Sequence, residues 1–360
     1  MLPDVALLRI FDFYVGGARM APWYTLVHVC RKWRTIVFGS PRRLNLRLRC
    51  SARTPVRETI DAWPLLPIVV LGYGHATWGV DNIIAAVGHN DRICKLDLLG
   101  VPYSQMENVF AAMQQPFPAL EDLRLYLESE TEVVPASFLG GSAPRLQSLY
   151  LDRIPFPGLP KLLLSATHLV SLNLANIPHS GYFSPEAMAT GLSALTSLET
   201  LIVEFESPRS RPDPPLTRTL LPVLIDFVFK GVSEYLDDLV ARIDAPLLNE
   251  LQITFFYQLI FDTPQLTQFI SRTPNFNPCD HALVQFCNWG VRVSIDSALR
   301  MKIPCLQSEW QLSCLAQVCG SIFIPQLNAS TFGRSHVIHR FGKTTSRLAN
   351  GWNFYIDLPL

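Results

Sequence analysis

Residues 120–125 read LEDLRL and residues 146–151 read LQSLYL, so both follow the spacing L-x-x-L-x-L. Because alternate side chains of a strand point to opposite faces, each copy predicts a short strand with one apolar face. Such strands, repeated about every 26 residues, bury that face by stacking beside one another. The spacing recurs between Ile93 and Ile253, with middle residues Leu96, Leu123, Leu149, Leu172, Leu201, Phe227 and Leu251.

The segments between these strands have helical or irregular patterns that can return the chain to the next strand, at 81–87, 106–113, 159–165 and 185–192. Spacing and period resemble those of leucine-rich-repeat proteins. That resemblance implies an α/β fold, a solenoid of parallel strands with a helical or irregular convex side. The repeats are irregular, because Val101, Ile154 and Ile177 stand where the family usually has Asn or Cys.

The first forty residues are apolar at helical spacing. Pro3 and Asp4 suit a helix start, Gly16-Gly17 and Pro22 interrupt the pattern, and a second helical stretch runs to Phe38. A segment this short and apolar needs a partner or a following domain to be stable.

Several motifs in this segment, namely Leu2-Pro3, Ile10-Phe11 and the string VCRxWR that begins at Val29, resemble the F-box. The resemblance implies a helical module that docks on the Skp-type adaptor of cullin–RING ubiquitin ligases. F-box and irregular repeats together resemble the fungal F-box-like proteins. The positions that match residues contacting the adaptor, or supporting that contact, are Leu2, Pro3, Leu7, Ile10, Phe11, Val29, Cys30, Trp33 and Val37.

Four regions are therefore expected. Residues 1–41 form the F-box, 42–92 a linker with capping strands or a helix, and 93–319 the repeat domain. The stretch from Phe276 to Ile295 is interpreted as one or two further repeats. Residues 320–360 lack the pattern and are expected to be poorly ordered or an unnatural continuation of the reading frame.

Composition narrows the classes of partner. Thirty basic and thirty acidic residues among 360 cancel, so no overall charge attracts nucleic acid or an anionic membrane. The stretch from Arg31 to Arg57 contains basic residues and no acidic residue. It is interpreted as a solvated rim, as a surface that contacts an acidic region of a partner, or as a nucleic-acid contact. Eight scattered cysteines and no apolar run of about 18 residues predict a cytoplasmic or nuclear protein.

Motifs for catalysis or cofactor binding are not found. The sequence has no glycine-rich phosphate loop and no G-x-S-x-G nucleophile motif. The spacings of Cys279, His281 and Cys287, and of Cys314 and Cys319, match no strong zinc pattern. We therefore expect no enzymatic activity, no cofactor and no metal.

The alternation within each predicted strand places polar residues on the concave face, where a protein target would bind. Arg124, Tyr126 and Tyr150 fall on adjacent strands and are residue types enriched at binding hot spots. The predicted function is substrate recognition for a ubiquitin ligase, with a non-catalytic interaction scaffold as the alternative. The target is an unknown protein, and neither nucleic acid nor a membrane is an expected partner. The candidate target-binding residues are Asp97, Arg124, Tyr126, Tyr150, Asp152, Asn173, Glu204, Lys230 and Gln252.

Overall fold

The chain is a mixed α/β protein with a mostly parallel, open sheet. It forms two compact units, Met1–Ile154 and Pro155–Leu360, so the division falls inside the 93–319 region expected from the sequence. The computed structural model describes residues 3–17, 23–38, 46–53, 55–63, 65–73, 79–128, 133–208, 218–258, 260–276, 281–295, 298–323 and 352–357.

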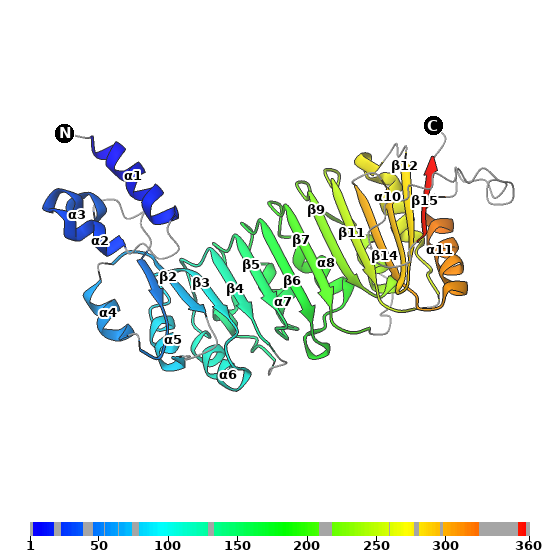
Figure 1. Cartoon of the computed structure of the whole chain (residues 1–360). Coiled ribbons are helices and arrows are strands. Elements are labelled where there is room, and N and C mark those ends of the chain that lie inside the picture. Colours follow the sequence, from blue (N-terminus) through cyan, green and yellow to red (C-terminus); the bar gives the residue numbers. More distant parts are fainter. Residues whose placement is uncertain are drawn as a thin grey trace. The chain divides into compact units, whose positions relative to one another are not determined.

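The first unit contains a parallel sheet whose strands follow one another in chain order (Figure 1). The leucines of the repeated pattern, such as Leu123 and Leu125, are fully buried in it. The strands predicted from that pattern are confirmed, and two further strands precede them within the region 42–92. The strands are β1 (Leu46–Arg49), β2 (Ile68–Tyr73), β3 (Ile93–Leu99), β4 (Asp122–Tyr126) and β5 (Ser148–Asp152).

Helices cover the apolar face of this sheet. The predicted return segments at 81–87 and 106–113 are the helices α5 (Val80–Val87) and α6 (Tyr103–Ala112). Phe110 of α6 meets Phe138 of the short helix η1 (Phe138–Gly141) edge to face, with ring centroids 5.8 Å apart. A further helix, α4 (Val56–Ala62), precedes β2 and packs against α5.

Three helices, α1 (Asp4–Gly17), α2 (Trp23–Val29) and α3 (Arg31–Phe38), precede the sheet of this unit. Phe11 packs on Trp33 with ring centroids 4.7 Å apart, which joins α1 to α3. Asp4 and Lys32 form an ion pair at 3.0 Å between the same two helices. The Arg34 Nε donates to the Val27 carbonyl at 3.0 Å and fixes the turn between α2 and α3.

The second unit begins with four parallel strands that carry the last four copies of the leucine pattern. Phe227 and Phe229 take the place of leucines in one strand and are fully buried, as are Leu201 and Leu251. These strands are confirmed as β6 (Ser171–Ile177), β7 (Thr200–Phe205), β9 (Asp226–Gly231) and β11 (Glu250–Phe255). A separate small sheet pairs β8 (Thr219–Leu220) with β10 (Ile243–Asp244).

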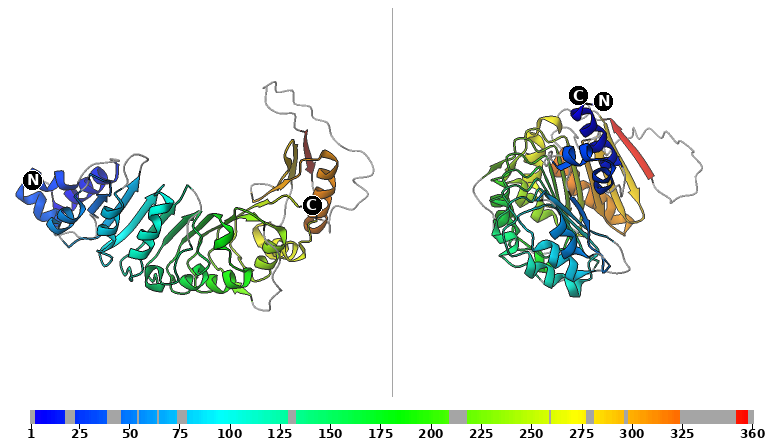
Figure 2. Two further views of the ribbon diagram at one scale, coloured as in Figure 1. Left: turned by 90° about the horizontal axis from the view of Figure 1, so that it is seen from below. Right: turned by 90° about the vertical axis from the view of Figure 1, so that its left-hand side faces the viewer.

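Helices of the second unit lie along one side of its strands (Figure 2). Two were predicted as return segments, α7 (Leu159–Leu163) and α8 (Pro185–Leu192). Helix α8 begins where the Ser184 hydroxyl accepts the Ala187 N–H at 3.1 Å, a side-chain N-cap. The helices that the sequence pattern did not reveal are α9 (Ser233–Val240), α10 (Pro264–Arg272), α11 (Ser308–Phe323) and the short η2 (His179–Gly181) and η3 (Pro274–Phe276).

A buried carboxylate joins α9 to α10. Asp237 of α9 is 4% exposed, and its Oδ1 accepts the Leu266 N–H in the first turn of α10 at 2.8 Å. Burial raises the pKa of Asp237 to about 6, although backbone N–H groups of Leu266 and Gln265 act in the opposite direction. The carboxylate thus supplies the N-terminal cap that the preceding Thr263 side chain does not provide.

The stretch from Phe276 to Ile295 does not form the further repeats predicted from its pattern. It contains β12 (His281–Cys287) and β13 (Gly290–Ile295), which pair antiparallel, and β13 pairs antiparallel with β14 (Leu299–Pro304). Only β14 continues the parallel order, next to β11. The reason is the connection: two residues, Asn288 and Trp289, can close a hairpin, whereas parallel strands need a long crossover.

Two parts of the region 320–360 lie within the described residues. Residues 320–323 end α11, and β15 (Trp352–Asp357) pairs antiparallel with β12. The strand covers what would otherwise be the edge of β12, so these residues have a neighbour even though they lack the repeat. Residues 324–351 and 358–360 lie outside the described residues.

Candidate protein-interaction surfaces

The residues that match the F-box divide into a buried and an exposed group. Leu7, Phe11 and Val37 are buried, Phe11 and Val37 completely, and Trp33 is half-buried against Phe11. In this packing, those three buried side chains can support a partner contact but cannot make one. Leu2 lies outside the described residues. The exposed members are Pro3, Ile10, Val29 and Cys30.

Three large apolar side chains of these helices are exposed. Val5 is 64% exposed, Val29 55% and Ile10 48%. The ion pair between Asp4 and Lys32 holds the start of α1, where Val5 lies, close to the helix that follows Val29. Val5 was not among the residues predicted from the F-box resemblance. We call Val5, Ile10, Val29 and Cys30 the N-terminal apolar surface.

The polar face of the first sheet carries the predicted anchor residues. The strand register places Arg124 of β4 beside Tyr150 of β5, and Tyr126 beside Asp152, so the expected juxtaposition of Arg124, Tyr126 and Tyr150 is confirmed. Arg124 is the most accessible of the three, with 48% of its side chain exposed. Its Nε lies 3.3 Å from Asp122 Oδ1.

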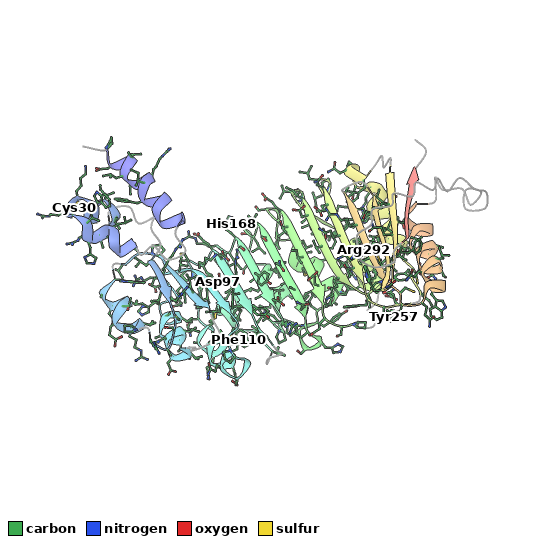
Figure 3. All side chains as sticks on the ribbon, viewed as in Figure 1. Cys30, Asp97, Phe110, His168, Tyr257 and Arg292 are labelled. Carbon is green, nitrogen blue, oxygen red and sulfur yellow. The ribbon has the colours of Figure 1, made fainter. Side chains whose placement is uncertain are left out.

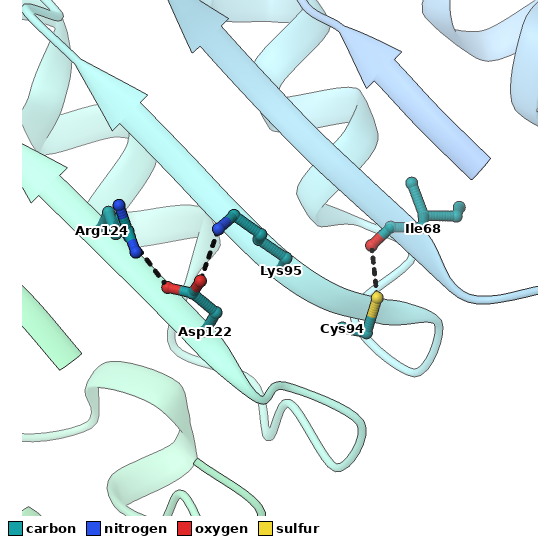
Figure 4. Close-up of polar contacts among 5 residues, drawn as sticks. All are labelled: Ile68, Cys94, Lys95, Asp122 and Arg124. Carbon is teal, nitrogen blue, oxygen red and sulfur yellow. Dashed lines mark hydrogen bonds and ion pairs between the residues drawn. The ribbon is translucent and has the colours of Figure 1, made fainter. Parts of the chain in front are cut away.

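Asp122 also binds a second cation. Its other carboxylate oxygen pairs with the Lys95 ammonium of β3, so one carboxylate bridges two cations on adjacent strands (Figure 4). Asp122 was not among the predicted target-binding residues. Because it holds Arg124 and Lys95 in place, it reduces the side-chain freedom that each would lose on binding a partner.

Two of the predicted target-binding residues are too buried for direct contact. Asp97, labelled in Figure 3, is 5% exposed and Asp152 is 8% exposed. The Tyr150 hydroxyl donates to Asp152 Oδ2 at 3.1 Å. Asp97 has Arg124 as its cross-strand neighbour on β4. Strand alternation assigns both to the correct face, but the larger Arg and Tyr side chains beside them cover them.

The polar face of the second unit carries the remaining predicted residues, each half-buried: Asn173, Glu204, Lys230 and Gln252. The Gln252 amide donates to Glu250 Oε1 at 2.6 Å, and the same oxygen lies 3.0 Å from Arg300 of β14. Sequence reasoning missed Arg300 and Lys302 because it predicted no strand at 299–304, and it missed Arg292 because it read 276–295 as further repeats rather than as an antiparallel hairpin.

Two buried thiols, those of Cys50 and Cys94, do not have the properties of nucleophiles. Burial raises the pKa of Cys50 to about 12, and burial together with Glu121 raises that of Cys94 to about 11. The Cys94 thiol is 3.5 Å from the Ile68 carbonyl, to which it donates (Figure 4). Both thiols are therefore protonated at neutral pH, and only a thiolate attacks or binds metal.

Within the part of the chain that the structure describes, no group of three or more His, Cys, Asp or Glu side chains could hold a metal ion. Cys279, one of the cysteines considered from the sequence, lies outside that part. Among the same described residues, no helix combines the length and the apolarity that crossing a membrane requires. Comparison of the sequence with protein-family models finds no match, and comparison with curated proteins finds none either.

Proposed function

We propose that the chain is a non-enzymatic adaptor with an F-box at its N-terminus and an irregular leucine-rich-repeat domain. The N-terminal helices dock on the Skp-type adaptor of a cullin–RING ubiquitin ligase. The polar faces of the repeat sheet bind a protein target. Catalysis then belongs to the recruited enzymes, and this chain contributes positioning.

The observation that carries the proposal is the N-terminal apolar surface. Val5, Ile10 and Val29 are roughly half exposed or more, whereas Phe11 and Val37 are completely buried and Trp33 packs on Phe11. Several exposed apolar side chains on one small helical element favour a surface that a partner covers. Three of the four surface residues, Ile10, Val29 and Cys30, are positions at which the sequence resembles the F-box.

The polar faces support the second half of the proposal. The strands turn their leucines toward the helices, and most of their other side chains are half-buried or exposed on the opposite face. An open sheet face with Arg and Tyr at its centre suits a broad protein partner, because these residue types contribute much of the energy at protein interfaces.

Charge substitution on the N-terminal apolar surface tests the proposal. We expect the purified chain to bind a Skp-type adaptor at micromolar concentration, and the Val29→Asp and Ile10→Asp variants to bind at least about tenfold more weakly, because each would bury an unpaired carboxylate. Leu220→Asp is the matched control: Leu220 is 59% exposed, but lies in the second unit.

The measurement is isothermal titration with melting temperature recorded for every variant. A wild-type chain that fails to bind, or a Leu220→Asp variant that weakens as much as Val29→Asp, contradicts the proposal. Target binding that persists without adaptor binding would favour an interaction scaffold outside the ubiquitin system.

A further inference from the structure

A row of cations crosses the polar face of the second unit. The register pairs Lys230 of β9 with Thr254 of β11, Thr254 with Lys302 of β14, and Lys302 with Arg292 of β13. Side chains paired in this way point to the same face of a sheet. Lys230, Lys302 and Arg292 therefore share one face, and we call them the basic row. Lys302 and Arg292 are exposed, and Lys230 is half-buried.

Two members of the basic row oppose each other directly. Lys302 and Arg292 are partners in the antiparallel ladder of β13 and β14, where opposite side chains have Cβ atoms about 5 Å apart. Like charges in this relation destabilise a sheet. The ion pairs within the described residues include none to either side chain, while the nearby Arg300 is paired with Glu250.

The structure holds one of these cations in place. The Arg292 guanidinium lies over the Trp289 ring, 4.7 Å from its centroid, at the hairpin between β12 and β13 (Arg292 is labelled in Figure 3). This cation–π contact restricts the arginine without neutralising its charge. A cation that is held in position, and for which the described residues supply no ion pair, is available to a ligand.

The geometry points to an acidic polypeptide segment as the occupant of the basic row. Lys230 lies two strands from Lys302, about 10 Å away, so the row matches carboxylates carried by several residues of an extended chain. This inference rests on the proposed function, and names the chemistry of the target that the second unit recognises.

Charge on the rest of this face argues for a polypeptide rather than a nucleic acid. Glu204 is the cross-strand partner of Lys230, and Asp226 and Glu250 lie on the same face further along their strands. A nucleic acid carries a negative charge at every phosphate and would meet these carboxylates as well. A polypeptide can place acidic residues over the basic row and neutral or basic residues over the carboxylates.

The test uses the full chain and a fluorescein-labelled peptide of alternating Glu and Ser residues. Anisotropy should show binding that weakens with salt, and the double variant Arg292→Gln/Lys302→Gln should bind at least about tenfold more weakly. The matched control, Arg47→Gln/Arg49→Gln, removes two exposed arginines from β1 in the first unit and should bind as the wild type does.

A third variant separates loss of binding from loss of folding. Lys302→Glu places a carboxylate opposite Arg292, so we expect peptide binding to disappear while the melting temperature stays at or above the wild-type value. A lower melting temperature contradicts the like-charge argument. No binding by the wild type, equal loss in the control, or equally tight binding of a labelled oligo(dT) overturns the inference. Adaptor binding, measured separately, is unaffected by any of these outcomes.

Discussion

The buried carboxylate of Asp237 should make stability depend on pH, and replacement by asparagine should reveal it. The folded chain holds the pKa of Asp237 near 6, against a value of 3.8 without the fold. A raised pKa means that the folded state binds the proton more tightly than the unfolded state does. The contribution of this group to stability is therefore full below about pH 4 and is lost as the pH rises through about 6.

The size of the effect follows from the shift. About two pKa units correspond to about 3 kcal/mol at pH 8, taken as an upper limit. Asp237→Asn keeps an oxygen that can accept the Leu266 N–H, but it carries no charge to desolvate. We expect the free energy of unfolding of this variant to equal or fall below the wild-type value at pH 4 and to exceed it at pH 8.

Asp237→Ala separates the charge from the cap. It also removes the buried charge, but it leaves the Leu266 N–H without its acceptor, which costs about 1–3 kcal/mol. The Ala variant should therefore be less stable than the Asn variant at every pH. Urea unfolding followed by circular dichroism, with the exposed Asp61→Asn as control, measures the difference. A difference between wild type and Asp237→Asn that does not change between pH 4 and pH 8 refutes the reasoning.

Two further predictions concern the antiparallel strands at the end of the chain. Gly290→Ala should lower the free energy of unfolding by at least about 2 kcal/mol, because Gly290 has φ +151° and an added Cβ would collide with the Ile303 carbonyl. The control variant Gly88→Ala should change the free energy of unfolding by less than about 1 kcal/mol. A chain ending at Phe323 loses β15 and exposes the edge of β12, so light scattering should show concentration-dependent association; a monomer of unchanged melting temperature would contradict this.

The repeated leucine pattern allowed most of the sheet to be predicted. Each copy from Leu96 to Leu251 lies in a parallel strand, because burying one apolar face at a regular interval leaves few other arrangements. Helix α9 could not be predicted in the same way. It contains Asp237 and Asp238, which look like solvated residues in the sequence but are each 4% exposed.

The sequence predicted on which face of the sheet the candidate residues lie, but not how deeply each side chain is buried. Alternation placed Asp97 and Asp152 on the polar face, but only the packed structure shows that neighbouring side chains cover them. Of the basic row, Lys230 was predicted, but Lys302 and Arg292 were missed because they come to the face through a hairpin. The string Asn288-Trp289-Gly290 between alternating residues was the available signal for that turn.

The proposed function depends most on the contact between the N-terminal apolar surface and a Skp-type adaptor. Cys30 is a reporter within that surface, since its thiol is exposed and Val29 beside it is 55% exposed. The decisive measurement is the rate at which iodoacetamide alkylates Cys30, followed by peptide mass spectrometry, with and without saturating adaptor. We predict that the adaptor slows Cys30 alkylation at least about tenfold and leaves that of the partly exposed Cys287 unchanged. An unchanged Cys30 rate would contradict docking through this surface.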